Sequence, residues 1–204
     1  MNARRRILAA SLAAASLALF GPQAFAQTPK VLKISHQFPG GSIDEGDFRD
    51  RMVRKFAAEV EKRTNGQLKF EIYPGGSLVK PVEQWGAMAN GSLDMSLYPL
   101  AYAGGRVPEL NIGLMPALVT SYEQGLRWKD APIGKELTRI VEEKGVKIIT
   151  WVWQAGGIAS RAKPVISPDD VKGLKFRGGS KEMDMMLKAA GASPTNVPSS
   201  EIYS

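Results

Sequence analysis

The fold class is indicated most clearly by residues 67–97, QLKFEIYPGGSLVKPVEQWGAMANGSLDMSL. Residues 67–73 alternate apolar and polar side chains, which is typical of a strand with one buried face. Pro74–Gly76 turns the chain, residues 81–90 have the pattern of a short helix, and residues 93–97 form the next apolar run. The stretch therefore predicts a strand, a helix and a second strand, which is the unit that builds parallel sheets.

The residues before this stretch extend the same pattern. Residues 31–35 form a short β-branched run that is typical of a buried strand. In residues 44–64 apolar side chains recur every four positions and the opposite face carries Arg and Glu, which predicts an amphipathic helix. Asn65–Gly66 ends this helix, because glycine adopts the left-handed conformation without a steric penalty. The β-α-β-α-β order predicts an α/β fold with a parallel sheet and right-handed crossovers.

The residues after this stretch contain a break and then a second set of elements. Residues 99–124 contain several glycines and prolines and show no clean helix or strand periodicity. This indicates a linker or a crossing between two halves of the chain. The later elements that we expect, in order, are a helix around Ile133–Val141, strands over 146–153 and 158–163, one helical turn from Ser167 to Gly173, a strand over 174–177 and a helix over 181–190. We therefore expect two α/β lobes, the first over residues 27–120 and the second over residues 121–204.

Residues 1–26 have the features of a secretory signal. Arg4–Arg6 is a basic start, residues 7–20 are an apolar stretch rich in Ala and Leu, and Ala24–Ala26 offers a small-x-small cleavage pattern. We expect cleavage after Ala26 and a periplasmic location for the mature chain.

Charge and cysteine content exclude several classes of protein. The chain carries 27 basic and 20 acidic residues, a net charge of +7, and its basic residues are interleaved with acids rather than gathered in a block. This distribution argues against a nucleic-acid partner, which requires a concentrated basic stripe. No cysteine is present, so the chain forms no disulfides. No second apolar run has membrane-spanning length, and we expect a mature chain that is monomeric and not membrane-embedded.

Residue types for common catalytic and metal sites are scarce. The chain has one histidine, so a paired-histidine metal site cannot form, and we expect neither a metal nor a cofactor. The Ser-x-x-Lys pattern of penicillin-binding enzymes occurs at Ser77–Lys80 and Ser160–Lys163. Both lysines precede proline, which disfavours the helix that this chemistry requires, and no Lys-Thr-Gly or Ser-Asp-Asn accompanies them. A periplasmic hydrolase stays as the alternative from another class of protein.

Several polar residues follow the ends of predicted parallel strands, where ligands bind in open α/β sheets. Arg177 ends one strand, and Gly178 and Gly179 leave room beside it for a ligand. An arginine there can hold a carboxylate with two parallel charge-assisted hydrogen bonds. His36 and Gln37 follow the first strand in the same way. The alternatives are a solvated charge for Arg177 and a structural role for His36.

Two tryptophans lie in the apolar run 146–153. We expect this run to be a strand covered on both faces, so that one of Trp151 and Trp153 can wall a cleft while the other fills the core. Trp153 is therefore a further binding candidate, with core packing as its alternative.

Residues 160–204 resemble the central segment of the DctP-type solute-binding proteins of tripartite ATP-independent periplasmic (TRAP) transporters. Their sequence is SRAKPVISPDDVKGLKFRGGSKEMDMMLKAAGASPTNVPSSEIYS. The shared features are an arginine, a Ser-Pro-Asp-Asp turn, a Lys-Gly-Leu-Lys-x-Arg run, a helix, and then Gly-Ala and Glu-x-Tyr. Residues 66–96 and ISHQFP, residues 34–39, are similar to earlier signatures of this family. The resemblance covers essentially all of the mature chain.

The resemblance implies a periplasmic-binding-protein-like fold, in which two α/β lobes close around a cleft that holds an organic acid. It also implies delivery of this acid to TRAP membrane permease subunits. By the same resemblance, Arg177 matches the arginine that clamps the carboxylate, and Arg161 matches a second arginine that often lines the same pocket.

Family members continue past the Glu-x-Tyr motif, which lies at residues 201–203 of this chain. We therefore expect an incomplete family member with an incomplete second lobe. A binding lobe that serves an ABC permease or a sensor kinase is the nearer alternative to a TRAP receptor.

Overall fold

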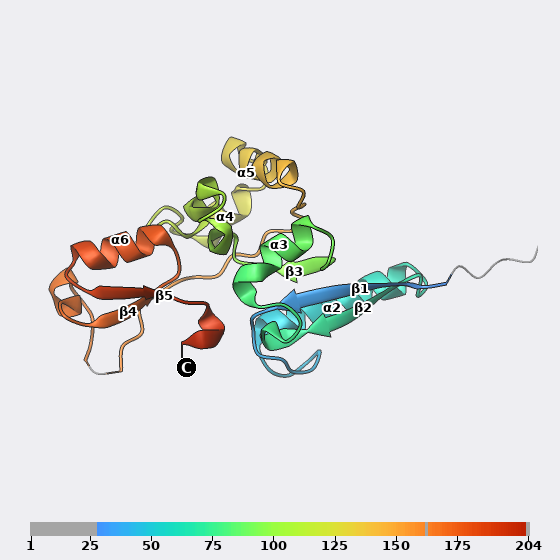
Figure 1. Ribbon diagram of the computed structural model, residues 1–204, viewed down its shortest axis with the longest axis horizontal. Helices are drawn as coiled ribbons and strands as arrows, with labels where there is room; N and C mark the ends of the chain where they lie inside the picture. The colour runs from blue at the N-terminus through green and yellow to red at the C-terminus, as the bar shows by residue number, and fades with distance from the viewer. Residues whose placement is uncertain (1–27, 162, 203–204) are drawn as a thin grey trace, which may run out of the picture.

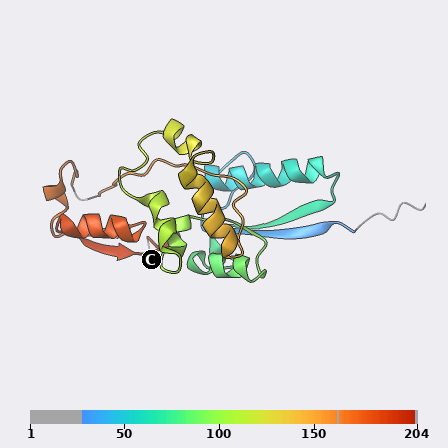
Figure 2. The ribbon, with the colours of Figure 1, turned by 90° about the horizontal axis from the view of Figure 1, so that it is seen from above.

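The computed structural model describes residues 28–161 and 163–202. The expected signal and its cleavage site lie outside these residues. The described chain is elongated, with one sheet at each end and the helices α4 (Tyr122–Arg127) and α5 (Pro132–Glu143) between them (Figure 1, Figure 2). No helix within the described residues is both long and apolar enough to cross a membrane.

The first sheet has three parallel strands in the order β2-β1-β3. These are β1 (Lys30–His36), β2 (Leu68–Tyr73) and β3 (Met95–Leu97). Two helices join them, α2 (Phe48–Arg63) after β1 and α3 (Gln84–Ala89) after β2. The predicted β-α-β-α-β order is therefore confirmed.

The helix α2 begins later than the periodicity alone indicates. Asp47 is its N-cap, and the Asp47 side chain accepts a hydrogen bond from the backbone N–H of Arg49. At the other end Asn65 and Gly66 have positive φ angles of 49° and 74°, as expected for a left-handed stop. Residues 44–46 therefore precede the helix instead of forming its first turn.

The segment that we expected to be a linker is part of the largest core. It contains two 3₁₀ helices, Leu100–Ala103 and Pro108–Leu114. Three of its apolar side chains are almost fully buried and pack with Trp128 and with residues of α5; these three are Ala103, Val107 and Leu110. Helices this short do not show the 3.6-residue period, which explains why the sequence pattern missed them.

The two strands expected over residues 146–153 and 158–163 are not present. Residues 146–160 have no regular secondary structure, and none of the strands of the described chain pairs with them. A strand needs a partner for its backbone hydrogen bonds, so an apolar run alone does not form one. Four of its apolar side chains instead pack against the core around Trp128, and three others are exposed; the packed ones are Val146, Ile148, Trp151 and Trp153, and the exposed ones are Ile149, Val152 and Ile158.

The second sheet has two parallel strands, β4 (Lys175–Gly178) and β5 (Ser193–Asn196), joined by α6 (Lys181–Ala189). The turn before β4 is a 3₁₀ helix, Pro168–Val171, with a capping box in which the side chains of Ser167 and Asp170 each bond the other residue's backbone. The strand β5 was not predicted, because Ser, Pro, Thr and Asn are weak strand formers.

The spacing of Met183, Met186 and Leu187 in the sequence of α6 predicts a face that packs into the core. Leu187 of the same face is buried, with 4% of its surface exposed, whereas Met186 is 42% exposed. The prediction is therefore wrong for Met186. This small sheet has one helix to pack on it, and the cluster of buried residues beneath α6 is correspondingly small.

Candidate functional site

Arg177 lies on β4 beside its carboxyl end and is half-buried. Its Nε donates a hydrogen bond of 2.9 Å to the carbonyl of Val197, and its Nη2 donates one of 2.7 Å to the hydroxyl of Tyr102. Within the described residues Nη1 makes no hydrogen bond. A Cβ atom at Gly179 would lie 3.4 Å from this Nη1, so glycine keeps the space beside it open. The guanidinium is thus fixed on one side and available on another.

Gln37 follows the carboxyl end of β1, the central strand of the first sheet, and is 4% exposed. Its side-chain oxygen accepts hydrogen bonds from the Tyr102 hydroxyl at 3.1 Å and from the backbone N–H of Ser199 at 3.2 Å. The same N–H also lies 3.2 Å from the Tyr102 hydroxyl. Tyr102 therefore links two of the predicted site residues, Gln37 and Arg177, across the two sheets.

His36 lies next to Gln37 but belongs to a different network. It is fully buried, and its Nε2 lies 3.1 Å from Oδ1 of Asp50. The other carboxylate oxygen of Asp50 accepts hydrogen bonds from the backbone N–H of Gly41 and from Arg54. Burial lowers the pKa of His36 from its ordinary value, against the opposing attraction of Asp50. His36 is therefore buried in contact with Asp50, while its Nδ1 has no hydrogen-bond partner among the described residues.

Trp153 and Arg161 lie apart from this network. Trp153 stacks on Trp151 with ring centres 6.3 Å apart and contacts Trp128 edge-on at 5.2 Å, within the largest core. The expectation that the two tryptophans face opposite sides is wrong, because residues two apart in an extended chain point the same way. Arg161 is exposed and makes no hydrogen bond or ion pair with the described residues.

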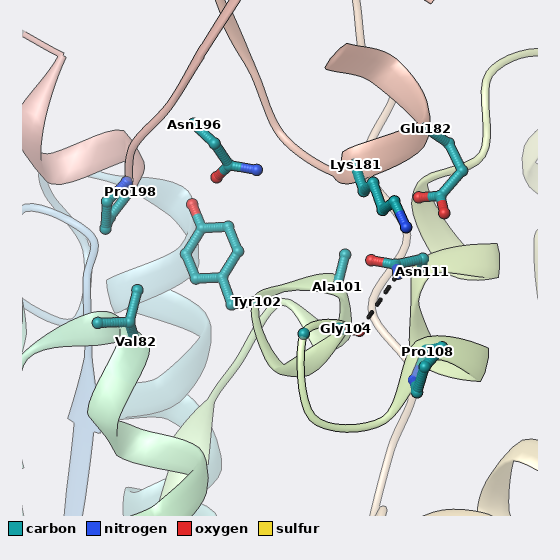
Figure 3. Close-up of a pocket in the computed structure, with 11 residues that line it drawn as sticks. Val82, Ala101, Tyr102, Gly104, Pro108, Asn111, Lys181, Glu182, Asn196 and Pro198 are labelled. Atoms are coloured by element: carbon teal, nitrogen blue, oxygen red, sulfur yellow. Dashed lines mark hydrogen bonds between the residues drawn. The ribbon is translucent and has the colours of Figure 1, made fainter. Parts of the chain in front are cut away.

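A cavity of about 370 Å³ opens beside Tyr102, between the second sheet and the 3₁₀ helix Leu100–Ala103 (Figure 3). Six of the residues that line it come from five separate segments; these six are Val82, Tyr102, Asn111, Lys181, Glu182 and Asn196. Its volume is at the lower end of the range for small-molecule sites.

No group of three or more His, Cys, Asp or Glu side chains that could hold a metal ion lies in the described chain.

Tyr102 is the functional candidate that sequence reasoning missed. It lies five residues after β3, and so beyond the same edge of the first sheet that drew attention to His36 and Gln37. The strand-end rule would have selected the segment from Tyr98 to Tyr102. We assigned this segment to a linker, and its role was hidden for that reason.

Gly178 is required by the fold of the second sheet. A Cβ atom at this position would lie 1.7 Å from Oδ1 of Asp184, which is far inside van der Waals contact. Asp184 also accepts a hydrogen bond from the side-chain amide of Asn196 through its other oxygen, at 3.2 Å. The glycine therefore brings α6 close to the end of β4, where Arg177 lies.

Comparison with known proteins identifies relatives with this arrangement of elements. The family model of bacterial extracellular solute-binding proteins, family 7 (DctP), matches residues 42–204. A solute-binding protein of Albidiferax ferrireducens is 67% identical over 180 residues, which cover 88% of this chain and 53% of the relative. The C4-dicarboxylate-binding periplasmic protein DctP of Rhodobacter capsulatus is 31% identical over 202 residues, which cover 98% of this chain and 59% of that protein.

A solved structure agrees with these matches. It is a TRAP periplasmic solute-binding protein from Rhodoferax ferrireducens with bound malonate, with a TM-score of 0.82 at 67% identity, and the match covers 84% of this chain and 54% of that one. The chain thus spans about half the length of the relatives it matches, in keeping with the expectation that it corresponds to part of a family member. The chain belongs to the bacterial extracellular solute-binding proteins of family 7, the DctP family.

Proposed function

We propose that this chain captures an organic acid by its carboxylate, as the receptor component of a TRAP-type transporter. The observation that carries the proposal is the state of Arg177. Val197 and Tyr102 fix its guanidinium, while Nη1 has no partner within the described residues. A fixed guanidinium with an open edge can form a charge-assisted pair with a carboxylate at a reduced entropic cost.

The ligands of the relatives support this proposal. The relative from Rhodoferax ferrireducens holds malonate, and a relative from Sulfurospirillum deleyianum, 25% identical, holds succinate. The Rhodobacter capsulatus relative is named for C4-dicarboxylates. These ligands share a carboxylate, which is the group that Arg177 is suited to bind.

The location and partners follow from the same proposal. The mature chain begins at Gln27 after cleavage behind Ala26, acts in the periplasm as a monomer, and delivers its ligand to TRAP permease subunits. Its first lobe comprises residues 27–120 and its second lobe residues 121–204, with the cleft between them.

The remaining candidate residues take different roles in the proposal. Gln37 orients Tyr102 and thereby Arg177. His36 and Trp153 have structural roles, since His36 contacts Asp50 and Trp153 packs on Trp128 and Trp151. Arg161 is an exposed cation that does not fix the ligand.

A hydrolytic role has less support. No hydrogen bond within the described chain joins Ser77 to Lys80 or Ser160 to Lys163, so neither Ser-x-x-Lys pattern forms an activated nucleophile there. Binding without turnover is therefore the function that the geometry favours.

The proposal is tested by thermal unfolding of the protein completed to the length of its relatives, with a panel of mono- and dicarboxylates and their matched amides; for residues 27–204 alone we expect no rise, because half of the cleft is absent from them. At about a thousandfold excess over its dissociation constant, a ligand adds about 4 kcal/mol of stability, which raises the melting temperature by several degrees. We expect at least one acid to produce this rise and its amide to produce none. The absence of any rise, or an equal rise with the amide, would contradict the proposal.

A further inference from the structure

We propose that residues 147–153, which we call the acceptor segment, become a β-strand by pairing with a strand of a second stretch of polypeptide. The partner to which we commit is the part of the fold that the full-length relatives carry in addition to the region they share with this chain. The pairing uses backbone hydrogen bonds and apolar contacts, so it can form whether that part is joined to this chain or supplied as a separate molecule. The inference does not depend on which ligand the chain captures.

The backbone of the acceptor segment is unpaired. From Lys147 to Trp153 no backbone N–H or C=O makes a hydrogen bond with a described residue. Hydrogen bonds resume at its two ends, where the N–H of Val146 donates to a carbonyl of α5 at 3.2 Å and the N–H of Ala155 donates to the Tyr122 hydroxyl at 3.4 Å. Backbone groups beside a core are rarely left without partners, and an unpaired run of them is a template for another strand.

The residue types of the acceptor segment favour a strand. Its sequence, KIITWVW, consists of β-branched and aromatic residues with one lysine, and it contains neither glycine nor proline. Residues of these kinds are enriched in strands, and the length of the segment is typical of one. The segment therefore has the propensity of a strand and lacks a neighbour to pair with.

The acceptor segment has a packed side and an open side. Ile148, Trp151 and Trp153 pack against the largest core. Ile149 and Val152 are 61% and 39% exposed. Burial of exposed apolar surface is the main favourable contribution to most protein association. A partner that pairs with the backbone can also cover these two side chains.

Contacts with both halves of the described chain hold the segment in place. The ring of Trp153 lies against α4, since a Cβ atom at Gly125 would lie 2.7 Å from it. The side chain of Gln154, directly after the segment, accepts a hydrogen bond of 3.4 Å from Arg49 of α2. A segment that is already positioned loses less conformational entropy when it pairs, which favours association.

The length of the relatives identifies the partner. The match covers 53% of the Albidiferax ferrireducens relative and 54% of the Rhodoferax ferrireducens structure, on which this chain superposes with a TM-score of 0.82. These relatives therefore contain the fold described above together with nearly as much chain again. A second copy of this chain is the rival occupant, and the experiment distinguishes the two.

The test uses hydrogen exchange of the backbone amides, followed by mass spectrometry. This chain is measured alone and after co-production with the part of the Albidiferax ferrireducens relative that lies outside the match. We expect the amides of residues 147–153 to exchange rapidly in the chain alone and on the order of a hundredfold more slowly with the partner, because strand pairing protects N–H groups. The amides of β1, which pairs with strands on both sides, should stay protected in both samples.

A chimera removes the dependence on a soluble partner. In it, the same part of the relative follows residue 204 of this chain in one polypeptide. We expect residues 147–153 to be protected in the chimera as they are in the co-produced complex.

A pair of substitutions tests the location of the contact. Ile149→Lys places a charge on the open side of the acceptor segment and removes no side chain of the core. We expect it to weaken association with the separate partner by at least about tenfold, which is the effect of losing one buried apolar side chain. Ile166→Lys makes the same change at an isoleucine that is 90% exposed and lies outside the segment, and it should leave association unchanged.

The outcomes separate this inference from the proposed function. Rapid exchange of residues 147–153 in both the complex and the chimera would overturn the proposal, and so would an equal effect of the two substitutions. Protection that appears in the chain alone and grows with its concentration would identify a second copy as the partner and overturn the assignment made here. Carboxylate binding is measured in none of these experiments, so their failure leaves carboxylate capture in place.

Discussion

Nη2 of Arg177 donates a 2.7 Å hydrogen bond to the hydroxyl of Tyr102, 75 residues earlier in the chain. The same hydroxyl donates to Gln37 at 3.1 Å. A single phenol therefore fixes the arginine of the second sheet against the carboxyl edge of the first. This contact depends on the tertiary fold, because the residues involved lie in three separate segments.

The change Tyr102→Phe should weaken carboxylate binding without unfolding the protein. It removes the hydrogen bonds to Arg177 and Gln37 but keeps the edge-on ring contact with Tyr98, whose ring centre lies 6.1 Å away. We expect a loss of about 1 to 2 kcal/mol in binding free energy, measured by calorimetry.

Tyr98→Phe is the matched control for this change. The Tyr98 hydroxyl is buried without a hydrogen-bond partner among the described residues, so its removal costs no bond and should leave affinity nearly unchanged while the melting temperature does not fall. If Tyr98→Phe weakened binding as much as Tyr102→Phe, the loss would not come from the hydrogen bonds that join Tyr102 to Arg177 and Gln37.

The change Gly178→Ala should destabilise the second sheet. The added Cβ would lie 1.7 Å from Oδ1 of Asp184, so α6 must move away from the end of β4. Overpacking of this kind costs about 1 to 3 kcal/mol, which a denaturant titration can measure. Gly157→Ala is the control, because no atom lies within 4 Å of its Cβ position. If the two variants were equally stable, Asp184 would be able to move away from the added Cβ atom at no cost in unfolding free energy.

Stability should fall as the pH drops below about 6.5, the ordinary pKa of histidine. His36 is the chain's single histidine, and burial lowers its pKa despite the nearby carboxylates of Asp50 and Asp47 and with a smaller contribution from Arg54. The unfolded state then binds a proton that the folded state resists. The unfolding free energy therefore decreases with falling pH, by at most about 1.4 kcal/mol per pH unit for one proton.

His36→Gln tests this linkage, because glutamine does not titrate and still offers a donor to Asp50. We expect the difference in unfolding free energy between the protein and this variant to change between pH values above and below the ordinary pKa. A constant difference over that interval would exclude His36 as the source of the pH dependence.

Arg161 should contribute less to binding than Arg177. Arg161 is exposed and has no fixed partner in the described chain, so solvent screens its charge and ordering it costs entropy. We expect Arg161→Gln to weaken carboxylate binding by less than about 1 kcal/mol, with an effect that shrinks as salt increases. A loss as large as that of Arg177→Gln would place Arg161 in direct contact with the ligand.

Local patterns predicted those parts of the fold that form from adjacent residues. The strand-helix-strand order of residues 30–97 and the capped turn at Ser167 follow from periodicity and turn chemistry, and the structure contains both. The strand expected over residues 146–153 depended on a partner strand that no local pattern reveals. The same limit applies to the site, where strand ends selected Arg177 and Gln37 but the bridging Tyr102 lay in an irregular segment.

The most direct test of carboxylate capture is calorimetric titration of Arg177→Lys with the acid that stabilises the protein most. Lysine keeps the charge but loses the planar pair of donors, so we expect affinity to fall by about 1.5 to 3 kcal/mol. Arg63→Lys, which makes the same change at an exposed position of α2, should bind as the unchanged protein does. Full affinity in Arg177→Lys would contradict the account, because Arg177 would then be a solvated strand-end charge and not the group that holds the ligand.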